Sequence, residues 1–206
     1  MSVFYEQVGA NVEVTLPDEF NLADTLDCGQ AFRWKECDGA FEGIARGKYL
    51  KVSSKDGKLI FHNTSIVIFD TVWWDYFDFE RDYTEIKNVL SADETLKKAI
   101  KFAGGIRILH QDPWECICSF IISQNNNIPR IKGIIERICE NFGEPIEGGY
   151  TFPTAEKIAA LTSEDLAPLR AGFRTKYILD AAKKVASREV NLREMLKMPT
   201  DEARAE

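Results

Sequence analysis

The segment from His110 to Phe142, HQDPWECICSFIISQNNNIPRIKGIIERICENF, decides the fold of the second half of the chain. It opens with two helix-start signals. Asp112 stands at the cap position, where its carboxylate accepts free backbone N–H groups, and Pro113 follows at the first helical position. Residues 116–122 are apolar almost all round, which predicts a buried helix. Four consecutive amides, residues 124–127, then favour a turn, because amide side chains compete with the helix for backbone hydrogen bonds.

A second helix is predicted to begin near Pro129. Its apolar side chains recur at helical spacing and so share one face: Ile131, Ile134, Ile135, Ile138 and Phe142. Gly143 is expected to end this helix. A polar corner at residues 124–127, with Arg130 beside it, is therefore predicted between two buried helices. On composition alone, such a corner is usually no more than a capped turn between helices.

The amino-acid sequence of this segment resembles that of a known family. QDPWECICSFIISQNNNIPRIKGIIERIC is similar to the matching segment of 8-oxoguanine DNA glycosylases, the helix–hairpin–helix enzymes of base excision. DCGQAFRW (Asp27–Trp34) and GFRTKYI (Gly172–Ile178) resemble two further segments of that family, in the same order along the chain. Three long motifs in order, spread over most of the chain, are far more specific than one short pattern.

Around this segment, the pattern predicts an α+β fold. Residues 3–16 favour one or two strands, and residues 31–63 favour a small antiparallel sheet whose turns are Asp38-Gly39, Arg46-Gly47 and Asp56-Gly57. The predicted helices are Phe20–Leu26, Ile66–Phe77, Phe79–Leu90, Asp93–Ala103, Pro113–Ile122, Pro129–Phe142, Ala155–Leu161, Ser163–Leu169, Arg174–Arg188 and Asn191–Met198. The aromatic residues of the helix at 66–77 are expected to pack on the sheet.

Two domains are expected from this order of elements. Residues 1–105 form an α+β domain, and residues 106–206 form an all-α helical domain. The resemblance implies a sheet of the TATA-binding-protein type in the first. It implies the N-terminal part of a helix–hairpin–helix glycosylase domain, incomplete, in the second.

Composition is that of an ordinary globular protein: 206 residues, 45% hydrophobic and 29% charged. The net charge of −7 argues mildly against a nucleic-acid partner, but distribution matters more than the sum. Residues 70–85 are acidic, with Asp70, Asp75, Asp78, Glu80, Asp82 and Glu85 against Arg81. Residues 170–188 are basic, with Arg170, Arg174, Lys176, Lys183, Lys184 and Arg188 against Asp180. The basic end could meet phosphates, or both segments are simply solvated helix faces.

The five cysteines do not predict a metal site or a disulfide framework, because their number is odd and no C-x-x-C pair occurs. Reduced, buried thiols of a cytosolic protein are the best interpretation. His62 and His110 are isolated, so we expect neither a metal nor a cofactor. No signal-like start and no run of about 18 apolar residues occurs, so no membrane span is expected.

The resemblance assigns roles to four residues of the helical part. A glycosylase turns its target nucleotide out of the duplex, which leaves a hole and an orphaned partner base. Asn125 matches the asparagine that enters the hole, and Arg130 and Arg174 match the two arginines that read the orphaned cytosine. Two guanidinium groups, which only donate, suit the N3 and O2 acceptors of cytosine, whereas the other bases each present an N–H there. Phe173 matches an aromatic wedge that is often tyrosine in the family; a core aromatic is the alternative.

Gly29 is implied to distinguish the lesion from guanine. 8-Oxoguanine carries an N–H at N7 where guanine has a lone pair, so one backbone carbonyl, that of Gly29, would accept from the first and repel the second. Glycine lets the main chain approach a ligand closely. The alternative is a plain helix C-cap after Leu26.

The Gly-rich hairpin PGVGxKVA, whose lysine forms a Schiff base in the family, does not occur in these 206 residues, and nor does the aspartate that follows it. We therefore expect a chain truncated before that hairpin, with its catalytic lysine and aspartate beyond Glu206, and no activity from the 206 residues alone. A non-catalytic DNA-binding module is the alternative, and a helical interaction domain is a weaker one. The expected partner is duplex DNA containing oxidised guanine, bound by a monomer in a bacterial cytoplasm or a eukaryotic nucleus.

Overall fold

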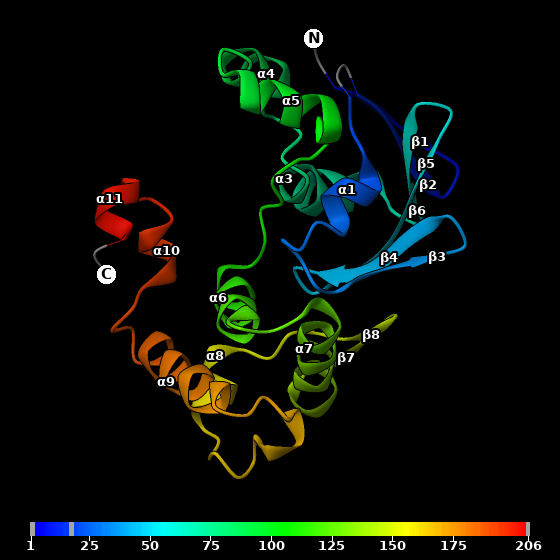
Figure 1. Cartoon of the computed structure of the whole chain (residues 1–206). Helices are drawn as coiled ribbons and strands as arrows, with labels where there is room; N and C mark the ends of the chain where they lie inside the picture. The colour runs from blue at the N-terminus through cyan, green and yellow to red at the C-terminus, as the bar shows by residue number, and fades with distance from the viewer. Residues whose placement is uncertain (1–2, 17–18, 205–206) are drawn as a thin grey trace. The chain divides into compact units, whose positions relative to one another are not determined.

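The computed structural model describes residues 3–16 and 19–204, and the chain divides into two compact units, Met1–Gln111 and Asp112–Glu206 (Figure 1). The sequence predicts a boundary after residue 105. The first unit holds a six-stranded antiparallel sheet and the second is helical apart from one two-stranded hairpin. The predicted α+β fold is confirmed.

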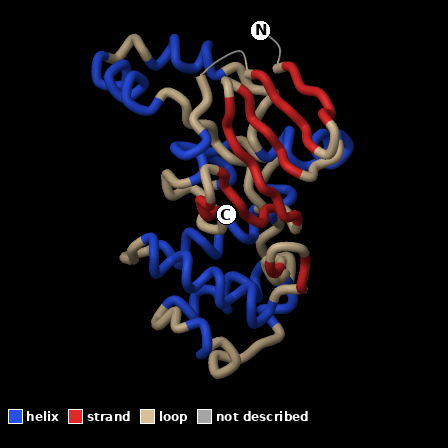
Figure 2. The backbone as a smooth tube through the Cα atoms, turned by 90° about the vertical axis from the view of Figure 1, so that its right-hand side faces the viewer, coloured by secondary structure: helices blue, strands red, loops and turns tan. Residues whose placement is uncertain are grey.

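The sheet of the first unit contains β1 (Phe4–Val8), β2 (Asn11–Thr15), β3 (Trp34–Cys37), β4 (Ala40–Ala45), β5 (Lys48–Lys55) and β6 (Lys58–His62). Its order is β1-β2-β6-β5-β4-β3, so the N-terminal hairpin extends the predicted sheet through the pairing of β2 with β6 (Figure 2). The predicted turns are confirmed. At Asp38-Gly39 and Asp56-Gly57, for example, both residues have positive φ, as tight hairpin turns require.

One face of this sheet is covered by α1 (Leu22–Leu26) and by a longer helix made of α2 (Ile66–Ile68), a π-helical turn (Phe69–Trp73) and α3 (Trp74–Tyr76). Alternate strand residues point inward, as period-2 patterning demands, with Val12, Leu50 and Phe61 almost fully buried. The aromatic residues of the helix do pack on the sheet as predicted: Phe69, Trp73 and Phe77 expose 0% of their surface.

The next predicted helix, Phe79–Leu90, starts later than the sequence indicates. Asp78 has φ 52 and interrupts the chain, Phe79 is buried in a loop, and α4 spans Tyr83–Leu90. Asp82 caps α4 by accepting from the N–H groups of Thr84 and Glu85. Helix α5 (Glu94–Ala103) begins in the same way after Asp93.

The second unit contains α6 (Pro113–Ser123), α7 (Ile128–Phe142), β7 (Pro145–Ile146), β8 (Gly149–Tyr150), α8 (Ala155–Ala159), a 3-10 turn (Ala167–Leu169), α9 (Arg174–Ala186), α10 (Leu192–Met195) and α11 (Thr200–Ala203). The caps agree with the sequence: Asp112 accepts from the N–H groups of Trp114 and Glu115. The predicted isoleucine face of α7 is buried.

Two further predictions are wrong, and one element is missing from the prediction. Residues 163–169 form only a 3-10 turn, because Asp165 bonds the N–H and hydroxyl of Thr162 and Pro168 follows. The hairpin β7-β8 was not predicted, although Gly148 and Gly149 supply the positive φ of its turn. The cysteines are free but not all buried: Cys118 and Cys139 are, whereas Cys28, Cys37 and Cys116 are exposed.

Candidate nucleic-acid interface

Most side chains of the amide corner between α6 and α7 form hydrogen bonds with the backbone of the same region. Gln124 Nε2 donates to the carbonyl of Phe120 at 3.1 Å, and Asn126 Nδ2 donates to the carbonyl of Ile122 at 3.0 Å. Asn127 is the N-cap of α7, because its Oδ1 accepts from the N–H of Arg130 at 3.0 Å. These three amides are therefore structural.

Asn125 differs from its three neighbours. It is exposed, its φ is 48, and its side-chain amide has no hydrogen-bond partner within residues 3–16 and 19–204. Asparagine tolerates this left-handed conformation better than most residues. The corner thus presents one uncommitted amide to its surroundings.

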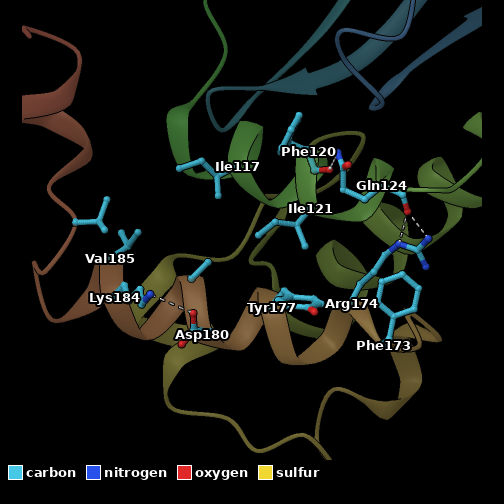
Figure 3. A pocket seen from close by; sticks show the side chains of 12 residues that line it. Ile117, Phe120, Ile121, Gln124, Phe173, Arg174, Tyr177, Asp180, Lys184 and Val185 are labelled. Carbon is cyan, nitrogen blue, oxygen red and sulfur yellow. Dashed lines mark hydrogen bonds and ion pairs between the residues drawn. The ribbon is translucent and has the colours of Figure 1, made fainter. Parts of the chain in front are cut away.

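Arg174 lies directly behind that corner, at the first position of α9, and exposes only 2% of its surface. Its Nε donates to the carbonyl of Gln124 at 3.1 Å and its Nη2 donates to the carbonyls of Gln124 and Asn125, the latter at 2.9 Å. Its Nη1 donates to the carbonyl of Ala171 at 3.4 Å. Figure 3 shows the guanidinium turned toward Gln124. Since it is buried, Arg174 does not belong to a phosphate-facing surface.

Phe173 is exposed over 57% of its surface, so the alternative of a core aromatic is wrong. The guanidinium carbon of Arg174 lies 4.5 Å from the centre of its ring, a cation–π distance. Tyr177, one turn along α9, meets the same ring edge-on at 6.5 Å between centroids. An exposed aromatic face therefore stands beside the amide corner.

Arg130 is exposed in the first turn of α7, three residues from its N-cap Asn127. The structure thus gathers Asn125, Arg130, Phe173 and Arg174 around one corner of the second unit. Only Arg174 is enclosed, and the other three can meet a partner directly.

An apolar groove of about 500 Å³ runs between α6 and α9 beside the corner (Figure 3). Its walls include Ile117, Ile121, Tyr177 and Val185. The sequence predicts α6 to be buried all round, but Phe120 exposes 67% of its surface and the groove leaves one side of the helix open.

Gly29 lies in the first unit, where its φ of 90 is one that favours glycine. It is not the helix C-cap, because α1 ends at Leu26 and its C-cap is Asp27. The loop that carries it is fixed by Gln30, which donates to the carbonyls of Thr25 and Arg107 and accepts from the N–H of Leu109. A carbonyl in so firmly held a loop has a defined direction.

Charged residues follow the sequence prediction only in part. Arg170, Lys176, Lys183, Lys184 and Arg188 are exposed in the basic segment. In the acidic segment Asp78 is buried, with 5% of its surface exposed, and pairs with Arg81 at 2.8 Å. It is therefore part of the fold rather than of a solvated face.

The described residues contain no group of three side chains of the kind that holds a metal ion, and none of their helices is long and apolar enough to span a membrane. Burial, with the nearby charges of Glu115 and Asp112, raises the pKa of the Cys118 thiol well above its ordinary value. That thiol is a poor nucleophile.

Comparison with known families agrees with this geometry. Residues 13–117 match the model of the 8-oxoguanine DNA glycosylase N-terminal domain, and residues 118–204 match that of the HhH-GPD superfamily of base excision DNA repair proteins. The chain belongs to the 8-oxoguanine DNA glycosylase family. The family predicted from the three motifs is thus confirmed.

Individual members of the family are similar to this chain over different lengths. MBOgg1, solved in complex with a low affinity DNA ligand, is 46% identical with a TM-score of 0.92, covering 98% of this chain and 72% of that one. The 8-oxoguanine glycosylase/lyase of Clostridium acetobutylicum, solved with dsDNA containing cytosine opposite 8-oxoG, is 40% identical with a TM-score of 0.93 and the same coverage. The N-glycosylase/DNA lyase of Saccharomyces cerevisiae is 44% identical over 89 residues, 40% of this chain and 24% of that protein. The chain spans less than half the length of the curated relatives that it matches.

Sequence reasoning within this family missed two parts of the interface. The carbonyls of Gln124 and Ala171, which bind Arg174, carry no side-chain signal and could not be found. The left-handed conformation of Asn125 was only weakly indicated by the sequence. The indication is that asparagine, after glycine, adopts this conformation readily, and that Asn125 lies in an amide-rich turn.

Proposed function

We propose that this chain is the damage-reading part of a base-excision enzyme that recognises 8-oxoguanine opposite cytosine. In the whole protein this part serves a DNA glycosylase with associated abasic-site lyase activity. The single observation that carries the proposal is Asn125, an exposed amide without a hydrogen-bond partner among the described residues. It is held in a left-handed turn beside an exposed arginine and an exposed aromatic ring. A side chain of that size and polarity suits the hole left by an extruded base.

The partner base is proposed to be cytosine. Arg130 and Arg174 flank Asn125, and guanidinium groups suit the two acceptors of its pairing edge. Phe173 offers a face on which a base can stack. The similarity to the Clostridium acetobutylicum enzyme, solved with cytosine opposite 8-oxoG, supports the same choice.

The lesion is proposed to be read by the carbonyl of Gly29, as an acceptor for the N7–H that distinguishes 8-oxoguanine from guanine. The positive φ of Gly29 and its position in a loop held by Gln30 support this assignment. The proposed location follows the substrate: the nucleoid of a bacterial cytoplasm, or the nucleus of a eukaryote.

The test of DNA reading compares two duplexes at fixed salt, one carrying an abasic-site analogue opposite cytosine and one intact. We expect tighter binding to the first and loss of that preference in Asn125→Gly, which keeps the turn conformation but removes the amide. Binding to the intact duplex, which rests mainly on phosphates, should barely change. Equal affinities for both duplexes in the unaltered chain would contradict the proposal.

Release of the base is expected to need residues outside these 206, since no Gly-rich hairpin with a lysine occurs among them. Incubation with an 8-oxoguanine duplex and borohydride should therefore trap no protein–DNA adduct. An adduct that disappears when one lysine of this chain is replaced would overturn this expectation. A DNA-binding module without catalysis is the alternative function, and it predicts the same binding result with no adduct from any longer form of the chain.

A further inference from the structure

The carbonyl of Gly29, proposed to read the lesion, is not held by a hydrogen bond of its own. Its oxygen accepts none within residues 3–16 and 19–204. Gly29 has a φ of 90 and no side chain that could restrict it, and glycine has more accessible backbone conformations than any other residue. The direction of this carbonyl must therefore be set by the residues next to it.

The next residue, Gln30, is held through both its side chain and its backbone. Its Nε2 donates to the carbonyls of Thr25 at 2.8 Å and Arg107 at 2.9 Å. Its Oε1 accepts from the N–H of Leu109 at 3.0 Å. Its backbone carbonyl accepts from Gln111 Nε2 at 2.6 Å. Gln30 and Gln111, the glutamine pair, thus join the loop of Gly29 to the segment 107–111, and both lie in the first unit.

Fixing Gln30 fixes the peptide plane that contains the Gly29 carbonyl. This plane also contains the N–H of Gln30, because the peptide bond is planar. With the side chain and the carbonyl of Gln30 both held, the plane can turn only through the φ of Gln30, and steric contacts restrict that angle in a residue with a side chain. The four hydrogen bonds of Gln30 therefore determine where the Gly29 oxygen points.

We propose that Gln30 and Gln111 are positioning residues that hold the Gly29 carbonyl, before DNA binds, in the direction that accepts from the N7–H of 8-oxoguanine. This inference rests on the proposed role of Gly29 and adds two residues to it. Each amide acts through the Gly29–Gln30 peptide. The glutamine pair therefore contributes to the choice between 8-oxoguanine and guanine and not to DNA binding in general.

The test without DNA is the order parameter of the Gln30 backbone N–H, measured by NMR relaxation, because this N–H shares its plane with the Gly29 carbonyl. We expect about 0.85 in the unaltered chain, as in rigid backbone, and less than about 0.6 in Gln111→Glu. The new carboxylate keeps the shape of the side chain but only accepts, so it repels the Gln30 carbonyl. An unchanged order parameter in Gln111→Glu would overturn the proposal.

Gln7 provides a matched control in the same unit. Its Nε2 donates to the carbonyls of Asn11 at 2.9 Å and Thr64 at 3.1 Å. Its Oε1 accepts from the N–H of Ile66 at 2.7 Å. Gln7→Glu therefore makes the same chemical change at another glutamine that binds the backbone, away from the contacts of the glutamine pair. It should lower the melting temperature without changing the order parameter of the Gln30 N–H or the choice of base.

The test with DNA compares three duplexes at one salt concentration, with 8-oxoguanine, guanine or an abasic-site analogue opposite cytosine. Gln30→Glu and Gln111→Glu should each lower the preference for 8-oxoguanine over guanine about fivefold, as expected for loss of one hydrogen bond. Affinity for the abasic analogue should barely change, because that duplex presents no base to the carbonyl. A preference that survives in both variants, or equal losses on all three duplexes, would contradict the positioning role.

The outcomes separate this inference from the proposed function. Equal binding of 8-oxoguanine and guanine by the unaltered chain would remove the role of Gly29, and the order parameter alone would then decide whether the glutamine pair holds the peptide. A preference that is present in the unaltered chain and kept in Gln111→Glu would leave Gly29 its role and remove that of the pair. Gln111→Ala deletes the amide without adding a charge, and it gives the same comparison with a smaller loss where Gln111→Glu fails to fold.

Discussion

Arg107 and Arg174 are the two buried arginines of the described residues, one in each unit, and each exposes 2% of its surface. Both tie loops together through backbone carbonyls. Arg107 Nη1 donates to the carbonyl of Asp78 at 2.8 Å, and Arg174 donates to those of Gln124 and Asn125. Both also lie 4.5 Å from the centre of an aromatic ring, Tyr83 for Arg107 and Phe173 for Arg174.

The surroundings of the two arginines differ. Around Arg107, Tyr83 exposes 8% and Asp78 exposes 5%, and the hydroxyl of Tyr83 donates to the Asp78 carboxylate at 2.8 Å. Around Arg174, Phe173 exposes 57%, and Gln124 and Asn125 are exposed as well. The same use of a guanidinium therefore completes a closed core in the first unit and supports an open, partner-facing corner in the second.

The largest effect that this comparison predicts is on stability. Arg107→Ala should lower the free energy of unfolding by about 2–5 kcal/mol, because it leaves a cavity and strands buried polar groups. Arg174→Ala should cost only about 1–2 kcal/mol, since water can reach exposed residues 124 and 125 and replace its bonds. Urea unfolding of each variant measures the difference, and hydrogen exchange shows which unit loosens.

Equal losses for the two variants would break the comparison, because both arginines would then serve the fold alone. A matched control is Arg46→Ala: the side chain of Arg46 is 28% exposed and donates to the carbonyl of His110. Its loss should fall below that of Arg107→Ala, because its groups remain in contact with water.

The contrast between the two arginines also marks what the sequence could predict. Periodicity and capping signals placed most helices and the antiparallel sheet, because the apolar face of α7 and the caps Asp112 and Asn127 are local features. The family motifs located the corner and its four residues. Nothing local distinguishes Arg107 from an exposed arginine, since its burial comes from Asp78, Arg81 and Tyr83 far along the chain.

The wrong predictions have two different causes, one local and one in the surroundings of a helix. Residues 163–169 have helix-like composition, but a side-chain bond from Thr162 to Asp165 competes with the helix. The apolar pattern of α6 predicts burial without saying what covers each side, and the groove that includes Ile117 and Ile121 shows that one side is open in this unit. Residues with the same local pattern thus end in different surroundings.

The next effect concerns the exposed side of the corner. Arg130→Ala should cost about 1–3 kcal/mol in binding to an abasic analogue opposite cytosine and should relax the choice of opposite base, as expected for loss of a base-edge contact. Affinities for the four opposite bases at one salt concentration measure it. Equal weakening opposite all four would mean that Arg130 contacts only phosphate. Lys132→Ala, in the same helix, is the control for general loss of charge.

Replacing the amides of the corner should have a smaller effect on stability, and that effect should distinguish an asparagine that holds the turn from one that is open to a partner. Asn127→Ala removes the N-cap of α7 and should cost about 1 kcal/mol of stability. Asn125→Gly should cost almost no stability, because glycine adopts a φ of 48 without strain. Asn125→Ala should destabilise the protein, because alanine pays more than asparagine to adopt a left-handed conformation. A fall in melting temperature for Asn125→Gly equal to that for Asn127→Ala would show that both asparagines only hold the turn.

The smallest effect is a dependence on pH that is expected in the surroundings of Arg107 but not in those of Arg174. The partners of Arg174 are backbone carbonyls, which do not titrate, whereas the surroundings of Arg107 connect through Asp78 and His110 to Asp75. Burial acts to raise the pKa of Asp75, but hydrogen bonds from His110 and Arg46 and the charge of Arg46 outweigh it, so the pKa lies below its ordinary value. A carboxyl whose pKa is lowered by folding stabilises the protein above its ordinary pKa and loses that contribution as the pH falls through the lowered value.

Asp75→Asn should therefore reduce the free energy of unfolding at neutral pH by about 0.5 kcal/mol, a modest figure because the side chain of Asp75 is 55% exposed and screened by water. The difference should shrink below about pH 4, near the ordinary value of an aspartate, and vanish in stronger acid. Urea unfolding across that range measures it, with Asp180→Asn in the second unit as control, since Asp180 only approaches Lys184 at 3.5 Å. A difference that persisted in strong acid would mean that Asp75 acts through packing rather than through its charge.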